Sequence, residues 1–534
     1  LAGGTGRYVA LLRWTVAHPG QTLVAALTVT GGLFIAYAEL GRGVDFFPEI
    51  EPRFAQIQVQ ARGDLSVWEA DDLVRSVESR LLDRPSLKTV YARTIGSPRD
   101  RLVQDYAEDV VGVIQLEFVD WQRRDPAAEI LDRLRDDLAD VPGVRLQFLT
   151  QSGGPEEGKP VVLEVAGERE GAPVRQLTAG VEHLRDGMRA VGGFVDIEDD
   201  RPLPGVEIRL EVDHREAARF GADVNLLGRA VQMLTRGVEL GDYRPADADE
   251  EVEIRVRFPF DERNLAQLVN LRVPTQAGLV PVRNFVEFVP APKTGIINRV
   301  DGRRTFTVEA DVAAGWLVDE RVRALTDWLD AHPMPAGSQL AVRGQQEEQA
   351  EAGRFLAAAF VVAIGLMFLT LVTQFNSLYQ AGLVLSAIAI STGGVLLALI
   401  LRGEPFSIVM SGIGVIALAG VVVNDNIVLI DTFNQLRREG IPADEAALRT
   451  GAQRLRPVVL TSVTTVLGLA PMVLGVTIDL IGREFSVGAP STQYWVQLAT
   501  AIAGGLIAAT LLTLLFTPAM LAWAGRRGRS EPVG

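Results

Sequence analysis

Three adjacent polar residues interrupt a long apolar segment in the last quarter of the chain. Residues 406–430 are numerous enough to cross a bilayer, and Asn424, Asp425 and Asn426 are the strongly polar residues of their interior. An ionised Asp at bilayer depth costs about 2.5–3.5 kcal/mol on insertion scales, so such acids pair with polar groups and mark ion or proton pathways. We therefore expect Asp425 to take up and release a proton, with Asn424 and Asn426 as hydrogen-bonding neighbours.

Helical spacing indicates which other residues of this segment accompany the acid. Residues seven apart lie within about 20° of each other around a helix. Asp431 therefore shares a face with Asn424, and Gly420 lies close to that face, whereas Asp425 points about 100° away. A glycine on such a face allows a neighbouring helix to approach closely. Asp431 also lies near the end of the segment, where charged side chains ordinarily reach the membrane surface.

The next apolar segment carries a complementary row of polar groups at helical spacing, namely Arg454, Thr461, Thr464 and Thr465. Hydroxyls and a guanidinium beside a carboxylate and amides can form a hydrogen-bonded track for a proton, because burial and nearby cations change the proton affinity of an acid. Thr464 and Thr465 suit a simpler interpretation as well, in which each hydroxyl bonds to its own backbone or to a neighbouring helix.

Composition limits the class of protein. The chain has 534 residues, 48% of them hydrophobic, and a net charge of −15, which argues against a nucleic-acid-binding protein with a basic surface. Cysteine is absent from the sequence, which excludes disulfides and thiolate metal sites. Six apolar segments approach the roughly 20 residues needed to span a bilayer, and they are 22–38, 355–372, 381–400, 406–430, 457–476 and 496–523.

Arginine residues predict the orientation of these segments. The connection between the fourth and fifth segments, the C-terminal tail and the stretch before the first segment all carry arginines. With six spans these three regions lie on one side of the membrane, and the positive-inside rule makes that side cytoplasmic. The stretch from about Asp45 to Glu351 is then extracytoplasmic.

The extracytoplasmic stretch contains an internal repeat of strand, helix and strand, whose helices are predicted at 66–82, 126–138, 174–190 and 318–332. Units of this length form small α+β sandwiches with helices covering one face of a sheet. A β-rich stretch lies between the third and fourth copies. The predicted fold is therefore an α-helical transmembrane bundle of six spans with a large α+β region of repeated βαβ units and a β-rich insertion.

Four motifs extend this pattern along nearly the whole chain: GVDFFPEIEP (43–52), QFNSLYQAGLVLSAIAISTGG (374–394), GVVVNDNIVLIDTFNQLRREG (420–440) and RLRPVVLTSVTTVLGLAPM (454–472). Together they resemble the second half of a resistance–nodulation–division (RND) permease, a family of proton-driven exporters of the bacterial inner membrane. The resemblance implies a secondary transporter rather than an enzyme, with no cofactor.

The resemblance also implies a domain order and a set of partners. The partners would be the first half of the permease on the same or a separate chain, further copies in a trimer, a periplasmic adaptor, an outer-membrane channel and the lipid bilayer. The implied domains are 1–44 (cytoplasmic flank and first span), 45–160 (first porter subdomain), 161–204 and 290–350 (second porter subdomain), 205–289 (docking subdomain) and 351–534 (five spans and the cytoplasmic tail).

The resemblance assigns roles to the polar residues of the spans. Arg454 and Thr461 match the relay arginine and threonine of the family. Asn424 stands where well-known drug pumps carry a lysine, and this chain has no lysine in any predicted span. We therefore expect Asp425, Asn424 and Asn426 to replace the lysine-based switch by hydrogen bonding. We expect helix packing or a secondary part in the relay for four further residues, Gly420, Asp431, Thr464 and Thr465.

The substrate cleft of drug pumps lies between the porter subdomains and is lined by phenylalanines. Here Tyr91 matches one of the aromatic positions, Gln115 stands where another Phe would be, and Phe118 lies close to them in sequence. The same residues also suit positions in a hydrophobic core. The acidic signatures of heavy-metal pumps are missing, so we expect a drug-exporter type that carries hydrophobic or amphiphilic compounds, and no metal site.

Two other classes of function remain open. A non-pumping RND-like accessory in protein or lipid translocation would not depend on proton uptake at Asp425. An intramembrane aspartyl protease would need Asp425 and Asp431 to converge from facing helices, whereas they lie on one helix about 120° apart. No phosphate-binding, nucleophile or zinc motif supports an ATPase or a hydrolase.

Overall fold

The computed structural model describes the chain apart from residues 1–4, 49, 62–64, 96–105, 108, 151–158, 170–171, 202–204, 236, 245–251, 277, 293–296, 314, 480–482 and 528–534. The chain divides into two compact units. One comprises Leu1–Arg201 together with Asn298–Gly534, and the other comprises Pro202–Ile297.

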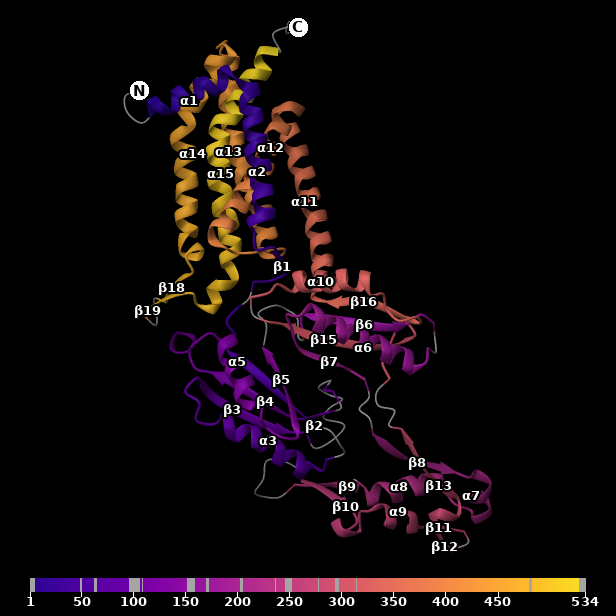
Figure 1. Ribbon diagram of the computed structural model, residues 1–534. Helices are drawn as coiled ribbons and strands as arrows, with labels where there is room; N and C mark the ends of the chain where they lie inside the picture. Colours follow the sequence, from indigo (N-terminus) through magenta and orange to yellow (C-terminus); the bar gives the residue numbers. More distant parts are fainter. Residues whose placement is uncertain are drawn as a thin grey trace. The chain divides into compact units, whose positions relative to one another are not determined.

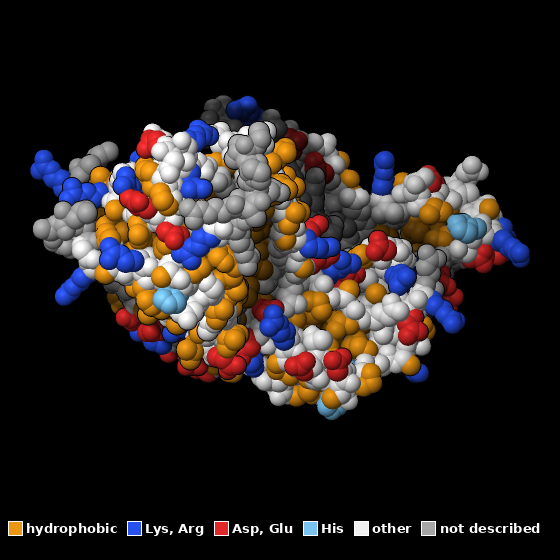
Figure 2. Space-filling model, turned by 90° about the horizontal axis from the view of Figure 1, so that it is seen from above, with side chains coloured by type: hydrophobic (Ala, Val, Ile, Leu, Met, Phe, Trp, Pro, Cys, Tyr) orange, Lys and Arg blue, Asp and Glu red, His pale blue; other side chains and the backbone are white. Residues whose placement is uncertain are grey.

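Among the described residues of the first unit, six helices are long and apolar enough to span a membrane (Figure 1), and they are α2 (Pro19–Leu40), α11 (Gln345–Phe375), α12 (Leu378–Arg402), α13 (Met410–Arg438), α14 (Ala443–Val473) and α15 (Pro490–Arg527). A shorter helix, α1 (Thr5–Ala17), precedes them and contacts α14 and α15. Figure 2 looks along the bundle from the end at which α1 lies, and side chains of both charges are interspersed with hydrophobic ones in this view.

The predicted start of the fourth span at residue 406 is wrong. Phe406–Ser407 form strand β17, which pairs in parallel with β1 (Val44–Asp45) directly after the first membrane helix. The Ser407 hydroxyl donates a hydrogen bond to the carbonyl of Phe46 and accepts one from the backbone N–H of Met410. This side chain satisfies a free N–H at the helix end, and so α13 begins at Met410.

Glycines allow α15 to lie against two neighbouring helices. A Cβ atom added at Gly394 of α12 would lie 2.2 Å from the Cβ of Ala508 on α15, and one at Gly505 of α15 would lie 2.1 Å from the side chain of Leu418 on α13. Small residues at such crossings let van der Waals packing hold membrane helices together. As a result, α15 contacts α12, α13 and α14 and is the central helix of the bundle.

The first α+β subdomain is a four-stranded antiparallel sheet with strand order β3-β4-β2-β5. Alternate residues of β2, among them Ile57 and Val59, are buried under helices α3 and α5, which cover one face. The helix α3 begins with a capping box between Ser66 and Glu69. The elements are β2 (Phe54–Ala61), α3 (Val67–Leu81), β3 (Leu87–Thr94), β4 (Val110–Phe118), α5 (Ala127–Leu138) and β5 (Val144–Thr150).

The second α+β subdomain has β6 between β15 and β16, with β7 and β14 also paired to β15. Helices α6 and α10 pack on this sheet and complete its core. Strand β16 leads directly into α11, so the sheet is joined to a membrane helix without a loop. The elements are β6 (Val161–Gly167), α6 (Val174–Val191), β7 (Phe194–Asp199), β14 (Arg299–Val300), β15 (Arg303–Val312), α10 (Val318–Ala331) and β16 (Ser338–Gly344).

The second unit contains the stretch predicted as β-rich, and it also contains three short helices. Each helix begins after an Asp or Asn whose side chain accepts a backbone N–H, namely Asp213, Asp223 and Asn264. Three antiparallel strand pairs surround the helices. The elements are β8 (Val206–Val212), α7 (His214–Phe220), α8 (Val224–Leu234), β9 (Val238–Tyr243), β10 (Val252–Val256), α9 (Leu265–Asn270), β11 (Arg272–Thr275), β12 (Gly278–Pro281) and β13 (Val286–Pro292).

A charged residue connects the first subdomain to the membrane helices. The Glu51 carboxylate forms an ion pair with Arg124, whose side chain is 2% exposed, and accepts the backbone N–H of Ala127 at the start of α5. The backbone N–H of Glu51 in turn donates to the side chain of Gln493 on α15 at 3.0 Å. The first turn of α15 is therefore bonded to the segment that enters the first sheet.

Adding a methyl group at Gly505 is expected to destabilise the bundle. The Cβ would overlap Leu418 and would also lie 2.9 Å from the Val395 side chain, and overpacking of this kind costs about 1–3 kcal/mol. The matched control is Gly365→Ala on α11, where a Cβ meets no atom within 4 Å. Thermal unfolding of the purified membrane protein should show a lower midpoint for Gly505→Ala only. Equal midpoints for the two variants would contradict the crossing.

Candidate functional site

The acid that the sequence singles out lies inside the bundle. Asp425 on α13 is 8% exposed, and its carboxylate is hydrogen-bonded to the hydroxyl of Thr461 on α14. The same hydroxyl also lies 2.9 Å from the carbonyl oxygens of Pro457 and Val458 in its own helix. Two of the five predicted relay residues are thus brought together across the α13–α14 contact. Both residues were predicted as members of one relay, Asp425 as an acid inside a span and Thr461 from the family motif, but they were not predicted to pair.

The amide of Asn426 bonds to a third helix. Asn426 is fully buried, and its Oδ1 accepts a hydrogen bond of 2.7 Å from the hydroxyl of Thr517 on α15. About two helical turns before Thr517 on α15, the hydroxyl of Thr510 forms a hydrogen bond of 2.6 Å with the hydroxyl of Ser462 on α14. Neither threonine of α15 was predicted as a site residue. Their seven-residue spacing, which repeats a polar position on one face of an apolar helix, is the signal that could have found them.

Arg454 does not reach the buried acid. Its Nε donates to the hydroxyl of Thr432 at 2.7 Å, and that hydroxyl donates to the carbonyl of Val428 in its own helix. Thr432 lies seven residues after Asp425 on α13 and is buried. The guanidinium and the carboxylate therefore belong to two separate contacts of α13 with α14.

The other predicted residues of the spans form an unpartnered polar face. Asn424 and Asp431 are exposed on α13, as helical spacing predicts, and Gly420 between neighbouring turns has no atom within 4 Å of an added Cβ. On α14, the Thr464 and Thr465 hydroxyls donate to carbonyl oxygens of their own helix. Within the described chain this face has no helix packed on it, and it adjoins the Asp425–Thr461 contact.

The three predicted cleft residues divide between the surface and the core of the first sheet. Tyr91 and Gln115 are exposed and lie directly opposite each other on β3 and β4. Phe118 is 2% exposed and packs in the core beneath the Arg124 guanidinium, 4.6 Å from its ring centroid. In this structure Phe118 therefore has no surface to offer a substrate.

Glutamines line the helix-free face of the same sheet. Gln56, Gln58 and Gln60 alternate along β2 with the buried core residues, and the strand register places Gln115 opposite Gln56 and Gln147 opposite Gln58. Gln60 is 3% exposed and its Oε1 has no hydrogen-bond partner. Gln147 is buried as well, whereas Gln56 and Gln58 are half-buried and Gln115 is exposed. The last three amides therefore form the part of the row that can hydrogen-bond a ligand through both donors and acceptors.

Charged groups connect the two α+β subdomains along the edge of this face. Gln60 donates to the Glu198 carboxylate of β7 at 3.1 Å, and Arg135 of α5 forms an ion pair with Asp196 at 3.2 Å. The buried ammonium of Lys159 lies 3.3 Å from the other oxygen of Glu198 and also donates to the backbone carbonyl of Asp196. The lysine therefore neutralises an acidic cluster where the two sheets meet.

Asp311 of β15 completes this cluster. Burial raises the pKa of its carboxyl group from 3.8 to about 6, an effect that Lys159 and Arg135 oppose and that Asp196 and Glu198 reinforce. Burial also raises the pKa of Glu198, against the opposing effect of Lys159. The contact between the two sheets therefore holds carboxyl groups that gain protons more readily than they do in water.

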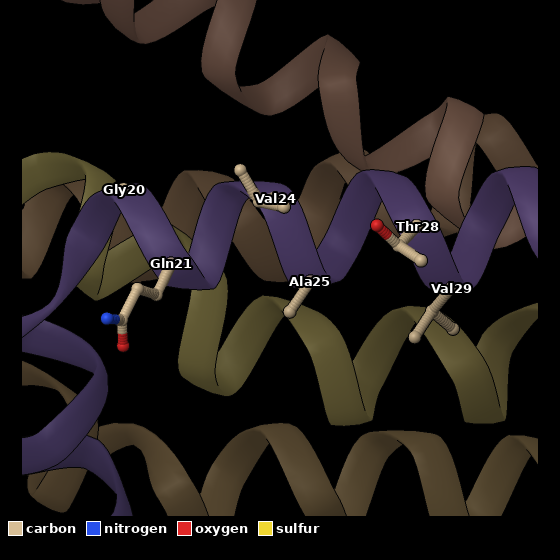
Figure 3. Close-up of a pocket in the computed structure, with 6 residues that line it drawn as sticks. All are labelled: Gly20, Gln21, Val24, Ala25, Thr28 and Val29. Atoms are coloured by element: carbon tan, nitrogen blue, oxygen red, sulfur yellow. The ribbon is translucent and has the colours of Figure 1, made fainter.

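A surface depression on the first membrane helix lies apart from all these residues. It is lined by side chains of α2 alone (Figure 3), and those residues are Gly20, Gln21, Val24, Ala25, Thr28 and Val29. None of the predicted site residues contributes to it.

Removing the Thr517 hydroxyl is expected to weaken the bundle. Thr517→Val keeps the shape of the side chain and leaves Oδ1 of Asn426 without its donor, at a cost of about 0.5–2 kcal/mol for a hydrogen bond between membrane helices. The control is Thr464→Val, whose hydroxyl bonds only to carbonyl oxygens of its own helix. Thermal unfolding should separate the two variants. A loss of stability for Thr464→Val as large as for Thr517→Val would count against the interhelical bond.

The stability of the contact between the two sheets is expected to depend on Asp311. Because its pKa is about 6 in the folded protein and 3.8 ordinarily, the folded state holds the proton more tightly. The free energy of unfolding should therefore fall as the pH rises through this window. Thermal unfolding at several pH values should show this decline, and Asp311→Asn should remove part of it. The exposed Asp330→Asn on α10 should leave the pH profile unchanged, and an unchanged profile for Asp311→Asn would refute the assignment.

Known proteins are similar to this chain over almost all of its length. It matches the AcrB/AcrD/AcrF family over residues 2–524. It is 26% identical over 552 residues to the cation efflux system protein CzcA of Alcaligenes sp. (strain CT14), covering 98% of this chain and 48% of that protein. It is 25% identical over 530 residues to the nickel and cobalt resistance protein CnrA of Cupriavidus metallidurans, covering 95% and 47%. It is 22% identical over 542 residues to the multidrug resistance protein MdtC of Salmonella paratyphi A, covering 98% and 50%.

The fold matches the crystal structure of a heavy metal efflux pump, with a TM-score of 0.76, 24% identity, and 98% of this chain and 52% of that chain covered. The expectation of a drug-exporter rather than a heavy-metal type is wrong, because the relatives named for cation, nickel and cobalt resistance are more similar in sequence than MdtC. A substrate site is formed by side chains from several elements, so a motif within one segment does not distinguish a drug exporter from a heavy-metal exporter. The chain spans about half the length of the relatives it matches. Since the family match covers nearly all of it, the chain belongs to the AcrB/AcrD/AcrF family of RND efflux transporters.

Proposed function

We propose that this chain forms the second half of a proton-coupled exporter and that Asp425 binds and releases the coupled proton. The observation that carries the proposal is the position of this acid, buried between α13 and α14 with a single hydroxyl partner, Thr461. Ionisable residues at such positions are costly, and proton relays are a common reason for their presence. A shift of α14 along α13 would change the contact between hydroxyl and carboxylate, and with it the proton affinity of the acid.

The unpartnered polar face beside Asp425 supports a role for a second bundle. Asn424 and Asp431 on α13 are exposed in a segment that is otherwise apolar, and polar groups in a membrane ordinarily face protein or a water-filled cavity. A first half of the permease, on the same or a separate chain, would cover them and add its own acids to the relay. The proposed assembly is a trimer in the bacterial inner membrane, joined to a periplasmic adaptor and an outer-membrane channel.

The region outside the membrane would carry the substrate. Residues 45–160 and the pair 161–204 and 290–350 are the proposed porter subdomains, and 205–289 is the proposed docking subdomain. The glutamine row on the helix-free face of the first sheet, with exposed Tyr91 beside Gln115, supports a path between the two porter subdomains. This surface offers amide donors and acceptors as well as one aromatic ring.

Divalent transition-metal cations are the first substrate class to examine, because CzcA and CnrA are named for cation efflux and for nickel and cobalt resistance. Within the described residues, no group of three or more His, Asp or Glu side chains is arranged to hold a metal ion, so a ligand set is not assigned. Hydrophobic or amphiphilic compounds are the second class. The name of MdtC and the exposed Tyr91 favour them.

The decisive variant is Asp425→Asn in the full-length transporter. This variant keeps the size of the side chain and its contact with Thr461, but its amide cannot bind and release the coupled proton. Proteoliposomes loaded with a pH-sensitive dye should lose substrate-driven proton flux, and uptake of Zn²⁺, Ni²⁺ or an amphiphilic dye should fall to the background. The control is Asp431→Asn on the exposed face of α13, which should retain most of the flux.

Three outcomes of this experiment have different meanings. Loss of flux for Asp425→Asn alone supports the relay, and the substrate that drives flux in the unchanged protein identifies the class. Unchanged transport in Asp425→Asn would reject proton coupling through this acid. Absence of proton flux with every substrate tested would favour the alternative of an accessory in protein or lipid translocation.

A further inference from the structure

A short hairpin joins the last two membrane helices, and its apolar face is uncovered in the described chain. Strands β18 (Val476–Asp479) and β19 (Glu484–Val487) follow α14 and precede α15. The predicted fifth span was expected to reach residue 476, but α14 ends at Val473 and the chain turns into this hairpin instead. Figure 1 shows the two strands at the end of α14 that is remote from the chain termini.

The strand register places the apolar residues of the hairpin on one face. Val476 lies opposite Val487, and Ile478 lies opposite Phe485. Residues directly opposite in an antiparallel pair share a face, as do residues two apart along a strand. All four side chains therefore point the same way, and three of them are largely exposed, with Ile478 61%, Phe485 68% and Val487 56% exposed.

The opposite face of the hairpin is polar and packs on the protein. It carries Thr477 and Ser486, which lie opposite each other in the register. The hydroxyl of Thr477 is hydrogen-bonded to the hydroxyl of Thr492 in the first turn of α15. The hairpin is thus attached to α15 by its polar side, and this attachment directs the apolar side outward.

The length of α14 places the hairpin at the edge of the hydrocarbon. Arg456 marks the arginine-rich end of the span, and Val473 lies about 25 Å further along the helix at 1.5 Å per residue. The hydrocarbon core of a bilayer is about 30 Å thick, so the chain leaves the helix close to the far boundary. Tyr494 and the exposed Trp495 lie in the first turns of α15 at this level. Such aromatic residues are enriched at membrane interfaces.

The outer surface of α14 leads to the hairpin without a polar break. Leu460, Val463, Leu467 and Leu474 are exposed and lie within about 60° of each other around the helix. Around the helix the centre of this stripe lies about 100° from that of Thr461 and Thr464, and Thr464 itself lies about 40° from Leu460. A stripe of leucine and valine on a membrane span faces lipid, and the hairpin face continues it.

We propose that the β18–β19 hairpin inserts its apolar face into the outer interfacial layer of the lipid bilayer and anchors the connection between α14 and α15 there. The occupant of this face is phospholipid, since the face continues a lipid-facing stripe at the depth where the hydrocarbon ends. This role is independent of proton coupling at Asp425.

The sequence contains no cysteine, so single cysteines introduced into the hairpin can be spin-labelled selectively. Phe485→Cys and Ile478→Cys report on the apolar face, and Ser486→Cys is the matched control on the polar face one residue away. Each variant is prepared in the transporter with its companion half free of other cysteines and reconstituted into phospholipid bilayers. Collision of the label with oxygen, which concentrates in lipid, is compared with collision with a water-soluble nickel chelate.

Labels at Phe485→Cys and Ile478→Cys are expected to collide more with oxygen than with the chelate, and the label at Ser486→Cys, on the face that packs on the protein, is expected to collide with oxygen less often than either. A higher chelate collision rate at both apolar positions would mean that the face lies in water and would overturn the proposal. Immobilised labels that meet neither reagent at both positions would overturn it as well, because a second copy or the first half of the permease would then cover the face.

Discussion

A polar group inside an apolar bundle is stable only where a neighbouring helix supplies its partner, and this constraint organises the membrane part of the protein. On α13, Asp425 meets Thr461 of α14, and Asn426 meets Thr517 of α15. These bonds require helices that lie close together, which in turn requires residues without large side chains at the crossings. Gly394 and Gly505 provide such places between α12, α13 and α15. The hydrogen bonds of the buried polar groups therefore depend on the glycines that allow the helices to lie close together.

One helix connects the buried polar groups to the region outside the membrane. The hydroxyl of Thr517, in the last third of α15, donates a hydrogen bond to Asn426. The side chain of Gln493, in the first turn of the same helix, accepts one from the backbone N–H of Glu51. Glu51 is paired with the buried Arg124 and caps α5 of the first sheet. An axial displacement of α15 would act on both contacts, because Gln493 and Thr517 belong to one continuous helix. Strand β16 and α11 provide a second direct connection, from the second sheet to the membrane.

The contact between the two sheets follows a different principle from the membrane bundle. Charged groups of both signs meet there, and the ammonium of Lys159 lies among Asp196, Glu198 and Asp311. A buried cluster of this kind is less a source of stability than a means to fix the relative position of two surfaces, since desolvation offsets much of the attraction. The glutamine row beside it leaves a hydrogen-bonding surface that no helix covers.

Local pattern predicted much of the fold. The periodicity of apolar residues predicted helices at 66–82, 126–138, 174–190 and 318–332, and the structure has α3, α5, α6 and α10 there with ends that differ by one residue. The pattern failed where a local contact competes with a helix or strand. Ser407 lies in a short strand and its hydroxyl accepts the backbone N–H of Met410, so α13 begins later than the apolar run. Three Asp and Asn caps begin helices in the stretch predicted as β-rich.

Composition and a fixed helical period are enough to identify which residues are polar inside the membrane and which helix face each one occupies. Their partners could be identified only from the packing of the helices. Arg454 was predicted as a member of the same relay as Asp425, yet it bonds Thr432, and Thr517 was not predicted at all. Phe118 was predicted for a cleft, yet it fills the core. Partners depend on how helices and sheets distant in sequence are placed against each other, and that placement is set by side-chain packing summed over the whole molecule, which no single segment encodes.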